Sequence, residues 1–169
     1  MKYLLFISLL FIFSACIKEP DCEPTNPEGV NYKGCGNFSV FEPFDEGSVQ
    51  NAIIHIHVDV EAFALTDEYQ NFSLTEHPEI LAQITSYNKS TMHGNLCTDG
   101  LDADLIATNV WTATEGDINM RIARPKSECD DTYVVDVLLN DAKFIDDNGN
   151  EILVSKVEFL HRMVNYPIG

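Results

Sequence analysis

Basic residues are scarce in this sequence, and their scarcity excludes one class of partner. The 169 residues include 27 Asp and Glu but only 10 Lys and Arg, so the formal net charge is −17 at pH 7. A protein that binds nucleic acid neutralises phosphates with clustered Lys and Arg. This chain would repel a polyanion, and we expect no nucleic-acid partner.

The sequence also lacks long apolar runs and the short motifs of common enzyme classes. Its longest apolar run, residues 4–13, is about half as long as a membrane-spanning helix requires. No G-x-S-x-G, H-E-x-x-H, P-loop or dinucleotide-binding pattern occurs. Since 45% of the residues are hydrophobic, the composition is that of an ordinary globular domain, and we expect one non-catalytic domain.

The first residues have the pattern of a secretory signal. Lys2 precedes the apolar run, and the small residues Ser14 and Ala15 come directly before Cys16. The segment Phe13-Ser14-Ala15-Cys16 resembles the lipobox of bacterial lipoproteins, with Phe13 where Leu is usual. The resemblance implies that residues 1–15 are removed and that Cys16 is lipidated, which would attach the protein to a bilayer. The alternative is a secreted protein in which Cys16 joins a disulfide.

Residues 16–34 are predicted to form a tether between the lipid and the domain. Lys18 and the acids that follow it resemble the export signal of Bacteroidota surface lipoproteins, which implies the outer membrane and its surface leaflet. Three prolines, Pro20, Pro24 and Pro27, favour an extended polyproline II conformation. We therefore expect the folded domain, residues 35–169, to stand off the bilayer.

Four cysteines remain once Cys16 is set aside, and an even number in an exported chain indicates two disulfides. Four cysteines allow three pairings, which the sequence alone does not separate. We favour the pairs that are nearest in sequence, Cys22 with Cys35 and Cys97 with Cys129. Because no C-x-x-C spacing is present, a metal–thiolate site is disfavoured.

The domain has the patterns of β-strands joined by turns. Residues 36–44 are predicted to form a first strand, and residues 51–63 alternate between apolar and polar side chains as a half-buried antiparallel strand does. Residues 75–87 suit either a short helix or a strand, and we favour the strand. Residues 104–113 and 118–123 are predicted to form a hairpin around Glu115-Gly116-Asp117.

A second hairpin is predicted at the end of the chain. The apolar residues of 132–145 and 151–164 flank Asn148-Gly149, a pair typical of type I′ turns, in which both central residues have positive φ. About seven short strands without a long helical repeat indicate a single antiparallel β-sandwich. The all-β class follows from these patterns, whereas the strand order does not.

The chain as a whole resembles small two-disulfide lipoproteins of Bacteroidota. The resemblance depends on Cys35-Gly36-Asn37-Phe38, on Cys97-Thr98-Asp99 before Val110-Trp111-Thr112-Ala113, and on Cys129 before Tyr133-Val134-Val135-Asp136-Val137. It implies an immunoglobulin-like β-sandwich on a lipid tether and transfers no catalytic residue.

The best candidate for a metal site is the polar face of the strand at residues 51–63. The period of two places His55, His57, Asp59 and Glu61 on one face, where two histidines could chelate Zn²⁺ or Cu²⁺ with Asp59 as third ligand. His77, His93 and His161 could join from elsewhere in the chain. The simpler interpretation is that these residues form the polar outer face that such a strand needs.

Acidic loops are candidates for Ca²⁺, although they lack the complete EF-hand pattern. The candidates are Asp99, Asp102 and Asp104, and the turn at residues 146–151. Position twelve counted from Asp146 is Val157, where an EF-hand has a bidentate Glu. A hairpin turn of solvated acids explains the same residues without an ion.

Three functions remain open. We favour a membrane-anchored, non-catalytic envelope module without a resident cofactor, whose partner is an unknown protein or glycan. The alternatives are a metal-binding module that uses the residues above and an envelope hydrolase with an unrecognised site. Glycan binding on a β-sheet generally uses exposed aromatic rings, and Trp111 lies in an apolar strand where core packing is the expected role.

Overall fold

A computed structural model describes residues 34–35, 38–47, 49–59, 63–90, 104–124 and 132–165. These residues form strands without a helix: β1 Gly34–Cys35, β2 Ser39–Glu46, β3 Val49–Val58, β4 Gln70–Ser73, β5 Ile80–Tyr87, β6 Ala107–Arg124, β7 Thr132–Asp146 and β8 Glu151–Asn165. No helix in this part of the chain could span a membrane. The signal segment, the tether before residue 34, Cys16, Cys22, Cys97 and Cys129 lie outside the described residues, and Cys35 is described only as part of β1.

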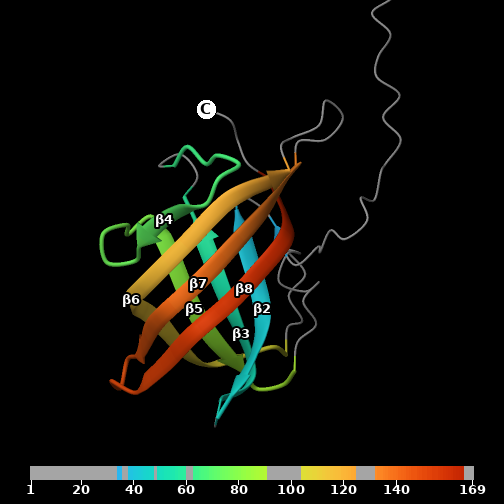
Figure 1. The fold of residues 1–169 in the computed structure, drawn as a ribbon. Coiled ribbons are helices and arrows are strands. Elements are labelled where there is room, and N and C mark those ends of the chain that lie inside the picture. Colours follow the sequence, from blue (N-terminus) through green and yellow to red (C-terminus); the bar gives the residue numbers. More distant parts are fainter. Residues whose placement is uncertain are drawn as a thin grey trace, which may run out of the picture.

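All the strands belong to one antiparallel sheet. Its hydrogen-bonded order is β1-β2-β3-β5-β6-β7-β8, and β4 pairs with β6 beside this path. The sheet curves until β8 contacts β1 and β2, and Arg162 of β8 forms an ion pair with Glu42 of β2. Figure 1 shows β6, β7 and β8 crossing in front of β2, β3 and β5. The all-β antiparallel class is confirmed, but the expected two-sheet, immunoglobulin-like sandwich is not, because the described strands form a single barrel-like sheet.

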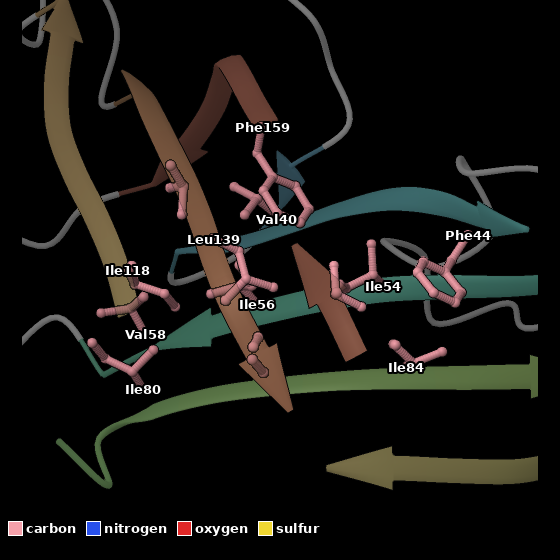
Figure 2. Packing of buried hydrophobic residues seen from close by; sticks show 14 of the residues in the cluster. Val40, Phe44, Ile54, Ile56, Val58, Ile80, Ile84, Ile118, Leu139 and Phe159 are labelled. Atoms are coloured by element: carbon pink, nitrogen blue, oxygen red, sulfur yellow. The ribbon is translucent and has the colours of Figure 1, made fainter. Parts of the chain in front are cut away.

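The core fills the space that the curved sheet encloses. Figure 2 shows Leu139 of β7 near Ile56 of β3, and Phe159 of β8 near Val40 of β2. These four side chains are fully buried. Because one face of each strand turns inward, burial of the apolar residues on that face is the main force that stabilises the barrel.

Strand β3 confirms the alternation predicted for residues 51–63 as far as Val58. Ile54, Ile56 and Val58 are buried in the core, whereas His55 and His57 are only partly buried on the opposite face. The strand favoured for residues 75–87 is also confirmed, since β5 begins at Ile80 after a turn that starts at Leu74. The helix is therefore the wrong alternative for this segment.

The predicted hairpin around Glu115-Gly116-Asp117 is wrong, because β6 continues through it as one strand of 18 residues. Gly116 has a φ of 126°, and the pairing of β6 with β7 shifts in register on both sides of Glu115. Here the glycine permits a bend where the sequence suggested a reversal. Before the bend β6 pairs with β5, and after it with β4, a short strand that the sequence did not predict.

The second hairpin is confirmed, but its turn type differs from the prediction. Ile145 pairs with Glu151, and the Gly149 N–H donates to the Asp146 carbonyl oxygen at 3.0 Å. Gly149 has a φ of 80°, whereas Asn148 is not among the residues with positive φ. A type I′ turn requires positive φ at both central positions, so this longer turn with one left-handed glycine replaces it.

Candidate functional site

The two histidines of β3 lie side by side on its outer face. Their ring centroids are 6.4 Å apart, and His57 Nδ1 lies 2.9 Å from Ser39 Oγ on the neighbouring strand. Burial, together with the neighbouring His57, lowers the pKa of His55. A lower pKa favours the neutral form of His55, which is the form that binds a metal.

The histidine pair lacks a third side-chain ligand within the described residues. No group of three or more His, Cys, Asp or Glu side chains that could hold a metal ion occurs there. His77 packs against the rings of Phe63 and Phe72, and His161 lies beside Asp136. The structure thus does not bring these histidines together, while Glu61, His93, Asp99 and Asp102 lie outside the described residues.

In the acidic turn between β7 and β8, the carboxylate of Asp146 forms hydrogen bonds within the turn. Asp146 Oδ1 accepts hydrogen bonds from the N–H groups of Asn148 and Asn150, at 3.0 and 2.8 Å. Its Oδ2 accepts from the side-chain amides of Asn109 and Asn150, both at 2.9 Å. Since N–H donors occupy both oxygens, this carboxylate is not available to Ca²⁺, and the calcium interpretation of this turn is not supported.

A different cluster appears on the outer face of β6, β7 and β8. The Asp136 side chain on β7 is 1% exposed, and its Oδ2 accepts hydrogen bonds from Arg121 Nε at 2.9 Å and Nη2 at 2.7 Å. Its Oδ1 accepts the backbone N–H of His161 at 2.8 Å. The hydrogen bond to Asp136 raises the pKa of Arg121. A buried carboxylate is costly unless its oxygens are paired, and here both are.

Local strand geometry explains why Asp136 can meet these partners. Arg121 and Asp136 are direct neighbours in the β6–β7 ladder. On the other side, the β7–β8 register shifts between Val135 and Val137, and His161 has a φ of 53°. The extra residue in β8 forms a bulge that turns the His161 N–H toward the carboxylate.

Tyr69 completes the cluster from the segment that precedes β4. The guanidinium carbon of Arg121 lies 4.6 Å from the centroid of the Tyr69 ring, and the Tyr69 hydroxyl donates to Asp136 Oδ2 at 3.5 Å. Tyr69 is 43% exposed and is the most exposed of the Phe, Tyr and Trp residues that the structure describes. We call Tyr69, Arg121, Asp136 and His161 the Tyr69 cluster.

This cluster was not predicted from the sequence, although the sequence contains one signal of it. Asp136 interrupts the apolar run Tyr133–Val137, where an acid requires a partner. Tyr69 has no comparable signal, because only the β4–β6 pairing brings it to Arg121. Trp111, in contrast, is buried in the core as predicted.

A surface hollow at the end of the β2–β3 hairpin gives no catalytic pair. It has a volume of about 270 Å³ and is lined by Pro43, Phe44, Asp45, Asn51, Ala52, Ile53 and Ser90. Asp45 is the one ionisable group among these lining residues. General acid–base chemistry needs positioned donor and acceptor groups, which this lining does not combine.

Comparisons of the chain with known proteins give no match. The chain matches no family model, no curated protein and no solved structure.

Proposed function

We propose that the protein is a lipid-anchored, non-catalytic module of the bacterial envelope that binds its partner through the Tyr69 cluster. The lipobox-like segment that ends at Cys16 supports the anchor. The observation that carries the binding role is an exposed aromatic ring and a cation held in place by a buried carboxylate. Groups that are already ordered lose little conformational entropy when a partner binds them.

The anchor is tested by changing the cysteine that would carry the lipid. The full chain and its Cys16→Ser variant are expressed in cells that mature lipoproteins, and their partition into a detergent phase is compared. We expect the wild-type chain in the detergent phase with an acyl-bearing N-terminus by mass spectrometry, and the variant in the aqueous phase. Equal partition of the two chains would overturn the anchor.

The binding surface is tested by site-specific crosslinking in intact cells of the producing organism. Benzoylphenylalanine, which reacts on illumination with nearby C–H bonds of proteins or glycans, replaces Glu68, the exposed residue next to Tyr69, in one chain and Leu153 in a control. Leu153 is 73% exposed and lies on β8 outside the cluster. A shifted species that forms from position 68 and not from position 153 supports the proposal. No such species from position 68 would contradict it.

A further inference from the structure

We infer that the Tyr69 cluster binds the ring of a neutral sugar, an inference that rests on the proposed function and names its ligand class. A sugar-binding surface needs an aromatic ring with one free face, held in a fixed orientation, and hydrogen-bonding groups around its edge. The described residues provide each of these features.

The backbone on both sides of Tyr69 is fixed to β6. The Ile122 N–H donates to the Thr66 carbonyl oxygen at 2.7 Å, and Gln70 pairs with Met120 as the first residue of β4. Figure 1 shows β4 beside β6, the strand with which β4 pairs. Tyr69 thus lies between two points of attachment, which holds it in register with Arg121.

The side chain of Tyr69 is also held. Arg121 covers one side of the ring, and the hydroxyl is directed to Asp136, while 43% of the residue remains open to solvent. Because Asp136 engages Nε and Nη2 of Arg121, the guanidinium keeps its orientation, and its Nη1 amino group lies on the edge away from the carboxylate. The part of Tyr69 that remains open to solvent offers an aromatic surface for stacking beside a cationic donor.

Two amide side chains lie in the next row of the same face. Asn71 pairs with Asn119 in the β4–β6 ladder, and Asn71 Nδ2 donates to Asn119 Oδ1 at 3.1 Å. Asn71 is two positions from Tyr69, and Asn119 is two positions from Arg121. The period of two therefore places these two amides on the same face as Tyr69 and Arg121. The Asn71 Oδ1 and Asn119 Nδ2 atoms supply an acceptor and a donor, the combination that sugar hydroxyl groups use.

Charge favours a neutral sugar over an acidic one. The chain has a formal net charge of −17, which disfavours the approach of a polyanion. Arg121 does not offset this repulsion, because Asp136 neutralises it locally. A neutral ring meets no such repulsion and can use stacking and hydrogen bonding together.

The experiment is affinity electrophoresis of the full chain, purified in lauryldimethylamine oxide because a maltoside detergent would compete. Native gels contain amylopectin, yeast mannan, a mixed-linkage β-glucan or xyloglucan as neutral probes, and polygalacturonate as the acidic one. We expect at least one neutral polysaccharide to retard the chain and polygalacturonate to leave its mobility unchanged. Tyr69→Ala should weaken that retardation by about tenfold in Kd, since the stacked ring is lost, whereas Leu153→Ala should retain it.

Several outcomes would overturn the inference: no retardation by any neutral probe, retardation that Tyr69→Ala leaves unchanged, or retardation by polygalacturonate alone. Emission from the buried Trp111 verifies that each variant is folded. The crosslinking experiment separates the two proposals. A crosslink to a protein at position 68 without polysaccharide binding would retain the binding module and reject the sugar, whereas failure of both would reject both.

Discussion

At the scale of single residues, Asp146 shows how one carboxylate can define a turn. Four N–H donors surround its two oxygens, and the hydrogen bonds from Asn109 and Asn150 lower its pKa from 3.8 to about 2. A carboxyl group whose pKa is lower in the folded state stabilises that state while it is ionised. The contribution of Asp146 to the free energy of unfolding is therefore present above about pH 4 and is lost as the pH falls toward about 2.

Replacement of Asp146 by Asn should therefore change the acid dependence of stability. We expect the melting temperature of Asp146→Asn to lie below that of the wild-type chain at pH 6, and the difference to shrink between about pH 4 and pH 2. Thermal unfolding followed by Trp111 emission measures it. The control is Asp147→Asn, an exposed acid in the same turn, whose difference from wild type should stay small. A difference for Asp146→Asn that is constant with pH would contradict this role.

At the scale of elements, the bend of β6 depends on the absence of a side chain at Gly116. A Cβ atom there would lie 2.7 Å from Ala142 Cα and 2.9 Å from Ala142 Cβ, and the φ of 126° is one that L residues rarely adopt. The bend lets β6 pair with β5 along one half and with β4 along the other. The attachment of the Tyr69 segment thus depends on this glycine.

Gly116→Ala should lower the free energy of unfolding by about 2–4 kcal/mol, because backbone strain and a clash with backbone atoms act together. Urea denaturation monitored by Trp111 emission gives the value. Gly149→Ala is the matched control: its φ is also positive, but a Cβ there meets nothing within 4 Å, so only the backbone cost of about 1 kcal/mol is expected. Equal losses for the two variants would show that the contact with Ala142 does not matter.

At the scale of the whole molecule, an ion pair connects the two ends of the curved sheet. The hydrogen-bonded order ends at β1 and β8, and the ion pair of Arg162 with Glu42 connects β8 to β2. Arg162 is 3% exposed, and its Nε and Nη1 atoms have no hydrogen-bond partner in the described part of the chain. Burial lowers the pKa of Arg162 to about 10. A cation in this position depends strongly on its carboxylate.

Glu42→Gln should destabilise the protein more than removal of both charges does. We expect a loss of about 3 kcal/mol for Glu42→Gln, since it leaves a buried cation without a counter-charge. The double variant Glu42→Gln with Arg162→Met should regain much of that loss, because an apolar side chain suits the buried position. Urea denaturation of the four chains in a double-mutant cycle provides the test. Additive effects would show that the two side chains do not act as a pair.

The candidate site could be predicted only in part. Its residues lie at positions 69, 121, 136 and 161, on a loop and three different strands. Composition and periodicity assign side chains to faces of strands, but the register between strands decides which of them meet. His55 and His57 are adjacent because they share one strand, so their pairing could be predicted from the sequence, whereas that of Asp136 with Arg121 could not.

The sequence by itself determined the local features: the all-β class, the alternation of β3, the last hairpin and the burial of Trp111. Each of these follows from the preferences of neighbouring residues, which act over a few positions. The tertiary structure alone decided that Gly116 bends a strand, that one sheet curves into a barrel-like form, and that Tyr69 lies on Arg121. These outcomes depend on contacts between residues distant in sequence, such as Gly116 with Ala142, whose energies no local pattern contains.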